Sequence, residues 1–154
     1  MLEHMSITAE YLCTIQAEID PPVTIARTGS MERRMIPITG GTVSGRLSGT
    51  ILPGGADWQY SYDSGLADLE ARYCLSLEDG AAVEVQSSGI RSGDPRVMEK
   101  LYTGGDVAPD EYYFRTAIKF RTSAERYAWL TRILCVGIAG RDKENVIIRL
   151  FEIG

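Results

Sequence analysis

The 154-residue sequence has few of the residues on which many catalytic and metal sites depend. It contains a single histidine, His4, and no Cys-x-x-C motif. His4 lies in residues 1–5, MLEHM, which resemble an expression-vector remnant with Met5 as the expected native start. A Ser–His–Asp triad and a histidine-based metal site are therefore not expected.

Charge and hydropathy argue against two classes of partner. The net charge is −5, and the arginines are scattered with no lysine-rich run. The sequence therefore lacks the basic patch expected of a protein that binds nucleic acid. No segment approaches the roughly 20 apolar residues that span a bilayer. The sequence thus predicts no nucleic-acid partner and no membrane partner.

The three cysteines are odd in number, far apart and placed in apolar runs, where a free thiol acts as a small hydrophobe. They are Cys13, Cys74 and Cys135. We expect no disulfide, a reducing environment and a cytoplasmic location. No glycine-rich motif precedes a helix, so nucleotide binding is not indicated. No cofactor and no metal are expected.

Alternation of apolar and polar residues with a period of two dominates residues 6–154, which are predicted to form one domain. The turn Asp63-Ser64-Gly65 predicts a hairpin between two such runs. A loop is expected over 23–37, with a possible short strand at 23–26. The predicted strands are 10–19, 39–52, 58–62, 66–77, 81–91, 111–122, 126–140 and 145–153.

One helix is predicted over residues 94–104. Asp94 is the expected N-cap, Pro95 occupies the first helical position and Gly104 follows the end. Many short strands with one helix indicate an all-β antiparallel sandwich or barrel, and the glycines within strands favour a small closed barrel. Barrels of about eight strands are filled by side chains or hold one small ligand.

Asp57 is the main candidate for chemistry. It stands in PGGADW, between a Pro-Gly-Gly break and the large apolar Trp58. An aspartate after a turn commonly caps backbone N–H groups, which is the alternative explanation. Beside a tryptophan in a semi-closed barrel, however, desolvation would raise the pKa of Asp57 toward values useful for proton transfer.

Arginines in β-rich runs are the second set of candidates. Each alone is more often a solvated surface charge, but four of them suggest that some point inward. An inward arginine must pair with a carboxylate or a ligand oxygen, and it could stabilise a phenolate or enolate. These arginines are Arg72, Arg91, Arg115 and Arg132.

Aromatic residues accompany these charges. Tyr113 and Arg115 are two apart and so share a strand face, where the tyrosine could donate a hydrogen bond to an oxyanion. Trp58 and Trp129 are expected to orient a ring in the pocket. Core packing is the alternative for all three aromatic side chains.

Several segments in order resemble the domain-of-unknown-function 3237 family. They include ITGGTVSGRLSGTILPGGADW, LADLEARYCLSLEDGAAVEVQSSGIR, EYYFRTAIKF and RYAWLTRILCVGIAG. The resemblance runs from about Ile38 to the C-terminus. It implies a lipocalin-like β-barrel, often a homodimer, in which fungal members look like cofactor-free cyclases of aromatic polyketide pathways.

Together these observations lead to a functional hypothesis. The chain is expected to be a cofactor-free cyclase or isomerase that acts on a small aromatic or polyketide-like molecule. Asp57 would move the proton, and Arg115 with Arg72 or Arg91 would stabilise the oxyanion. Tyr113, Trp58, Trp129 and Arg132 would contact the substrate. The alternatives are a lipocalin-like protein that binds a small apolar ligand without turnover, and a filled barrel whose outer face mediates dimerisation.

Overall fold

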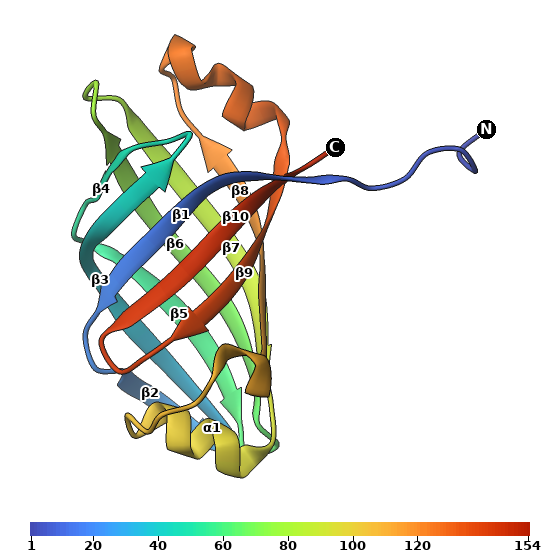
Figure 1. Cartoon of the computed structure of the whole chain (residues 1–154). Coiled ribbons are helices and arrows are strands. Elements are labelled where there is room, and N and C mark those ends of the chain that lie inside the picture. The colour runs from blue at the N-terminus through green and yellow to red at the C-terminus, as the bar shows by residue number, and fades with distance from the viewer.

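Residues 1–154 are described by a computed structural model, in which ten antiparallel strands and three short helices follow the alternating sequence pattern (Figure 1). The strands are β1 (Ala9–Ile19), β2 (Val23–Thr28), β3 (Met31–Gly45), β4 (Gly49–Ile51), β5 (Gly55–Tyr62), β6 (Leu66–Leu77), β7 (Ala82–Ser92), β8 (Tyr113–Arg121), β9 (Leu134–Arg141) and β10 (Asn145–Ile153). The helices are α1 (Pro95–Tyr102) and the 3₁₀ helices η1 (Pro109–Glu111) and η2 (Glu125–Arg132).

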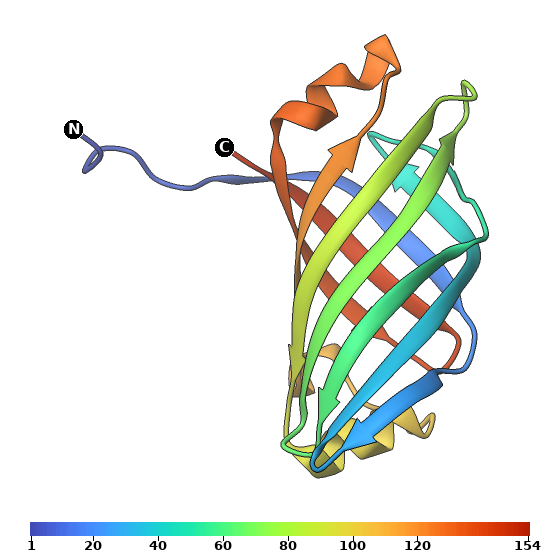
Figure 2. The ribbon, with the colours of Figure 1, turned by 180° about the vertical axis from the view of Figure 1, so that it is seen from behind.

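Eight of the strands close into a barrel. The circuit runs β1–β10–β9–β8–β7–β6–β5–β3 and returns to β1, with every neighbouring pair antiparallel (Figures 1 and 2). β4 lies between β3 and β6, and β2 pairs with β3 alone. The predicted all-β barrel with one short α-helix is confirmed. None of the helices is long and apolar enough to cross a membrane.

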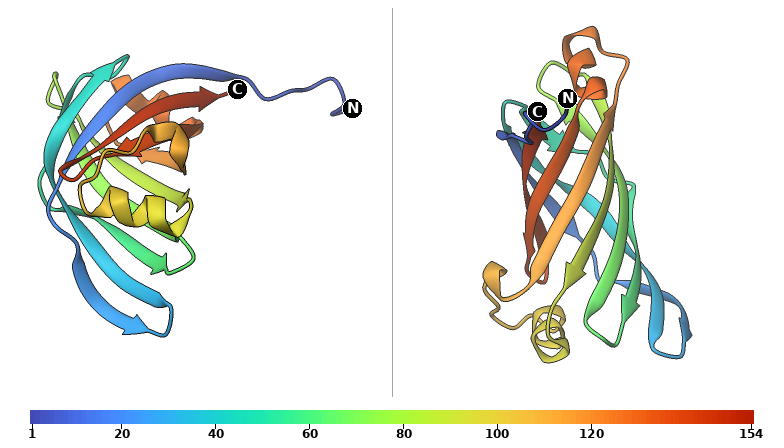
Figure 3. Two further views of the ribbon diagram at one scale, coloured as in Figure 1. Left: turned by 60° about the horizontal axis from the view of Figure 1, so that its bottom comes forward. Right: turned by 90° about the vertical axis from the view of Figure 1, so that its right-hand side faces the viewer.

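The long strand β3 creates an opening in the barrel wall. Its first half pairs with β5 through Ile38, whereas β1 pairs with its second half. β1 stops at Ile19 and the chain turns through Pro21 and Pro22 into β2, which lies along the free edge of the first half of β3. The β2–β3 ladder therefore stands away from β10, and Figure 3 shows this hairpin projecting from the wall.

Apolar side chains fill the barrel end that carries η2. Leu12, Leu47, Leu75, Leu130 and Leu150 are almost completely buried there, and η2 covers that end (Figure 1). Such close packing leaves no space for a ligand at this end. The interior can therefore bind a ligand only toward the opposite end.

Helix α1 covers the opposite end of the barrel. The Asp94 side chain accepts a hydrogen bond from the Arg96 backbone N–H at 2.9 Å, and Pro95 begins the helix, as the sequence predicts. Met98 and Leu101 are buried beneath it. The last residue of α1, Tyr102, is thereby held at the barrel mouth.

Two sequence predictions are corrected by the structure. The segment 23–37 is not a loop, because β2 and the first half of β3 occupy most of it. The predicted strand 126–140 begins only at Leu134, because residues 125–132 form η2. The first half of β3 was not predicted because inward-facing Arg34 interrupts its apolar alternation with a buried charge.

Replacing Gly41 should destabilise the closure between β1 and β3. Gly41 has a φ of +139°, and a Cβ there would lie 2.0 Å from the Gln16 carbonyl oxygen. We expect Gly41→Ala to lower the free energy of unfolding by about 3–5 kcal/mol, measured by urea denaturation. Gly54→Ala is the control, because Gly54 has a φ of +109° with open space around it and should cost about 1–3 kcal/mol. Equal losses in the two variants would contradict the steric argument.

Candidate functional site

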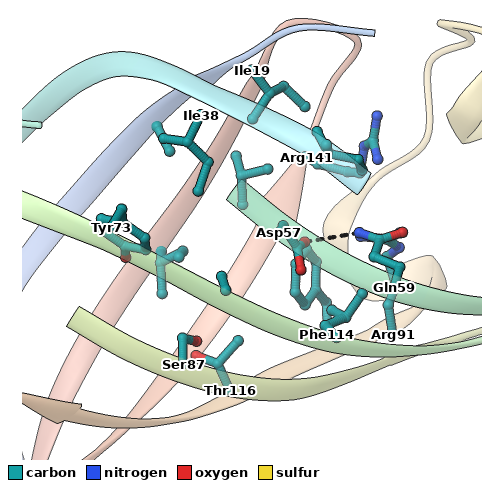
Figure 4. Close-up of a pocket in the computed structure, with 16 residues that line it drawn as sticks. Ile19, Ile38, Asp57, Gln59, Tyr73, Ser87, Arg91, Phe114, Thr116 and Arg141 are labelled. Carbon is teal, nitrogen blue, oxygen red and sulfur yellow. Dashed lines mark hydrogen bonds between the residues drawn. The ribbon is translucent and has the colours of Figure 1, made fainter. Parts of the chain in front are cut away.

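A cavity occupies the barrel interior beside α1, where inward residues from eight strands converge (Figure 4). Its volume is about 40 Å³, which is room for about three water molecules. Most of the wall is apolar. The residues that line it are Ala17, Ile19, Ile36, Ile38, Asp57, Gln59, Leu69, Ala71, Tyr73, Ser87, Arg91, Phe114, Thr116, Arg141, Val146 and Ile148.

Asp57 is the carboxylate of this cavity. It lies within β5, opposite Ile36 of β3 and Ala71 of β6, and its carboxyl points into the barrel (Figure 4). Oδ2 accepts a hydrogen bond from Gln59 Nε2 at 2.8 Å, and Oδ1 is buried without a partner. Burial raises the pKa of Asp57 above its ordinary value, although Gln59 and the nearby arginines oppose the shift.

Gln59 connects Asp57 to two arginines. It is fully buried, and its Oε1 accepts from Arg34 Nε at 2.9 Å and from Arg91 Nη2 at 3.3 Å. Because its amide oxygen faces the two guanidinium groups, its NH₂ group is directed to Asp57. The side-chain amide of Gln59 therefore fixes the Asp57 carboxyl and the two guanidinium groups relative to one another.

Three guanidinium groups surround Tyr102. The Cζ atoms of Arg34, Arg91 and Arg141 lie 4.8, 5.0 and 5.3 Å from the centre of its ring. Arg91 also donates from Nε to the Tyr102 hydroxyl at 3.0 Å. Burial and the neighbouring positive charge lower the pKa of Arg141 to about 10. The site thus concentrates positive charge in a place poorly reached by solvent.

The cavity continues into an outer groove at the barrel mouth. This groove has a volume of about 660 Å³, and Ile19 and Arg141 belong to both spaces. It runs between the β1–β2 turn, the β9–β10 turn and Tyr102. Its lining residues are Glu18, Ile19, Asp20, Pro21, Pro22, Arg34, Tyr102, Arg141, Lys143, Glu144 and Asn145. A small organic molecule fits the groove, whereas the inner cavity holds only a substituent of it.

Two further polar atoms in the inner cavity have no partner in the protein. They are the Tyr73 hydroxyl and Thr116 Oγ1, both buried. Burial raises the pKa of Tyr73 strongly, so its hydroxyl is a hydrogen-bond donor and not a base. With Asp57 Oδ1, these atoms give an apolar cavity a small number of polar contacts that water or a substrate oxygen can satisfy. No group of three histidine, cysteine, aspartate or glutamate side chains converges as metal ligands would.

Of the residues that the sequence singled out, Asp57 and Arg91 meet in the cavity. The turn-cap alternative for Asp57 does not hold, because its carboxyl accepts from a side chain within a strand. Arg91 is 1% exposed, as expected for an arginine that points inward.

Three other candidates lie on the outer face of the barrel. Trp58 is 41% exposed beneath Arg33, and Tyr113 is 53% exposed. Arg115 lies over the Tyr113 ring and donates to the Phe114 carbonyl oxygen. They occupy the outward positions of β5 and β8, so they do not line the interior cavity.

Arg72, Arg132 and Trp129 are also away from the cavity. Arg72 is exposed on β6, 3.5 Å from Glu84. Trp129 and Arg132 belong to η2, at the end of the barrel opposite α1 (Figure 1). Trp129 packs against the core and Arg132 is exposed. None of these three side chains lines the interior cavity.

The sequence interpretation did not select Gln59, Arg34, Arg141 or Tyr102. The sequence pattern could have identified Arg34 and Arg141, because each stands at the end of a series of inward-facing residues spaced by two. Ile38 and Ile36 lead back to Arg34, and Ala139 leads to Arg141.

The buried carboxyl of Asp57 should make stability depend on pH. Its pKa is raised in the folded state, so its contribution is fully present below the unfolded value near 4 and is lost as the pH rises through the folded value. The Asp57→Asn variant has no carboxyl to ionise at this position, so it does not lose this stability as the pH rises. In urea unfolding from pH 4 to pH 8, we expect the stability of Asp57→Asn relative to the native chain to increase with pH. Exposed Asp68→Asn is the control, and a pH-independent difference for Asp57→Asn would contradict the assignment.

Comparison with known proteins gives consistent matches. The model of the family described as "Protein of unknown function (DUF3237)" matches residues 7–153. A UPF0311 protein of Bradyrhizobium diazoefficiens is 40% identical, over 96% of this chain and 97% of that protein.

Solved structures match over nearly the whole chain. A conserved protein of unknown function from Rhodopseudomonas palustris is 38% identical with a TM-score of 0.90, covering 97% of this chain and 99% of that one. A beta-barrel like protein from Acinetobacter baumannii is 36% identical with a TM-score of 0.86, covering all of both chains. An enzyme from Penicillium herquei shares the fold at 19% identity and a TM-score of 0.74, covering 97% of this chain and 96% of that one.

Proposed function

The chain belongs to the DUF3237 family, and we propose that it is a cofactor-free enzyme that transfers a proton within a small aromatic or polyketide-like substrate. The observation that carries this proposal is the unpartnered, buried Oδ1 of Asp57, which faces a cavity next to Arg91. Because burial raises its pKa, the Asp57 carboxyl keeps its proton to a higher pH than a solvated aspartate does, which suits a general acid. The Penicillium herquei neighbour, described as an enzyme, supports the idea that this fold can host catalysis.

The reaction that we propose is intramolecular hydroalkoxylation. Protonated Asp57 gives its proton to one carbon of a substrate alkene, and the phenol oxygen forms a C–O bond to the other carbon. The phenol O–H bond breaks and its proton returns to the Asp57 carboxylate. Atoms and charge balance, so the product is an isomer of the substrate with a new oxygen heterocycle.

We assign to Arg91 alone the oxyanion role that the sequence interpretation gave to Arg115 together with Arg72 or Arg91. As the phenol loses its proton, negative charge develops on the oxygen, and a fixed guanidinium in a dry site stabilises that charge. Gln59 and Tyr102 hold Arg91 in place by hydrogen bonds from Nη2 and Nε. Because the guanidinium is already oriented, little reorganisation is needed during the reaction.

The substrate ring is proposed to lie in the outer groove and not in the inner cavity. The inner space of about 40 Å³ accepts one small group, whereas the groove of about 660 Å³ accepts one or two rings. The reacting oxygen and alkene would then reach past Arg141 toward Asp57. The homodimer and the cytoplasmic location remain predictions from the sequence.

The test is product formation from phenols that carry an ortho alkenyl group. We expect chromatography with mass spectrometry to detect a product of unchanged mass with one phenol hydroxyl fewer. Saturable binding of such phenols without any new product would favour the non-catalytic binding protein. That alternative has less support for an apolar ligand, because an apolar molecule gives three guanidinium groups no counter-charge.

A further inference from the structure

Three guanidinium groups at the mouth of the barrel have no carboxylate within salt-bridge distance. Arg34, Arg91 and Arg141 lie around one tyrosine ring, and none of them forms an ion pair with a carboxylate. Asp57 reaches them only through Gln59 and could balance at most one charge. Buried guanidinium groups that are not paired with a carboxylate are costly, so such a cluster favours the binding of an anion.

Two of the three arginines have guanidinium nitrogens without an acceptor in the protein. Arg34 is 7% exposed, and its Nη2 is buried with no hydrogen-bond partner. Arg141 is anchored by Nε to the Asp142 carbonyl oxygen at 3.2 Å, which leaves both of its Nη groups without a protein acceptor. Arg91 is already committed by two hydrogen bonds to Tyr102 and Gln59.

The position of the two free arginines specifies where the anion lies. Arg34 and Arg141 both line the outer groove, and Arg141 also lines the inner cavity. An anionic group between them would therefore sit at the junction, outward of Asp57. A substrate held there by one end would extend its other groups toward the carboxyl.

The surroundings favour a singly charged, planar anion. A carboxylate matches the planar donor fork of a guanidinium, and two guanidinium groups can bind its two oxygens. Glu18, Asp20 and Glu144 line the same groove and would repel a doubly charged phosphate more strongly than a carboxylate. The apolar wall of the inner cavity likewise suits an organic acid.

The geometry points to a carboxylate subsite formed by Arg34 and Arg141, so that the substrate class is an organic acid whose carboxylate is anchored at the mouth. This inference rests on the proposed function for what happens next to Asp57, but the anchoring itself does not depend on turnover. The carboxylate would fix the distance between the bound molecule and the acid, as a bidentate clamp does.

Sodium benzoate is a suitable probe, because it has one ring and one carboxylate. We expect isothermal titration calorimetry to show saturable binding of benzoate, no binding of benzyl alcohol, and weaker binding of inorganic phosphate, each at constant ionic strength. Arg141→Gln should weaken benzoate about 10–100-fold, as loss of a charge-assisted hydrogen bond does. Arg34→Gln should have a similar effect, and Arg141→Gln keeps the test valid if the buried Arg34 variant is unstable.

Arg33→Gln is the matched control. Arg33 precedes Arg34 in β3 but points outward over Trp58 and Tyr60, so this variant should bind benzoate like the native chain. Equal binding by native protein and Arg141→Gln, or equal binding of benzoate and benzyl alcohol, would overturn the carboxylate subsite. Tighter binding of phosphate than of benzoate would overturn the choice of anion. Benzoate binding without turnover of any alkenyl phenol would count against the proposed reaction alone.

Discussion

Asp57→Asn is expected to reduce turnover by about 10²–10⁴-fold, which is the usual contribution of a general acid–base group. The asparagine keeps the size of the side chain and can still accept the hydrogen bond from Gln59 Nε2. It cannot give or take the proton. The free energy of unfolding at neutral pH should be unchanged or higher, because a buried carboxyl is replaced by a neutral amide. Steady-state kinetics together with urea denaturation measure both effects.

The combination of the two measurements separates catalysis from folding. A purely structural Asp57 predicts lost stability with activity lost in proportion, whereas a catalytic Asp57 predicts lost activity in a well-folded protein. Asp68→Asn is the control, because Asp68 is exposed on the outer face of β6. Full activity in Asp57→Asn would remove Asp57 from the mechanism.

Gln59→Leu should cause the largest loss of stability among substitutions at the site. The change leaves Arg34 Nε, Arg91 Nη2 and Asp57 Oδ2 without their amide partner. An unsatisfied buried polar group costs about 1–3 kcal/mol, so we expect about 3–5 kcal/mol in total, measured by urea denaturation. Water in the small cavity can compensate only part of this loss.

Activity should also report the role of Gln59 as a positioning residue. The hydrogen bond from Gln59 lowers the pKa of Asp57. Its removal should therefore shift the apparent pKa of Asp57 in the pH–rate profile to a higher value. Gln16→Leu, on the outer face of β1, is the control and should change neither stability nor profile appreciably. A Gln59→Leu protein as stable as the native chain, with an unchanged profile, would show that the amide does not connect acid and arginines.

The buried polar network around Gln59 is unfavourable for folding. Three cations and one carboxyl in an apolar interior lower the stability of the native state unless a ligand or water compensates. Polar groups of this kind tend to occur where binding or catalysis uses them. At the η2 end, by contrast, buried leucines fill the barrel, and this apolar packing stabilises the fold.

Part of the site could have been predicted by extending the period-two pattern to the strand ends. In β7 the inward positions Val85 and Ser87 lead to Arg91, and the same counting leads to Arg34 and Arg141. It also places Arg72 and Arg115 outside, because each lies out of phase with its buried neighbours. The sequence interpretation treated all arginines in β-rich runs alike, and so selected Arg91 together with arginines that face solvent.

The amino-acid sequence alone determined the all-β class, the hairpins, helix α1 and the candidacy of Asp57, because those depend on local alternation, turns and caps. Only the tertiary structure decided that Arg34, Arg91 and Arg141 meet around Tyr102, and that Trp58 lies outside. Period two says which side chains share a face of a strand. Which face is the interior, and which strand ends meet at the mouth, depends on how β3 closes the barrel, with β5 on one edge of its first half and β1 on the other edge of its second half.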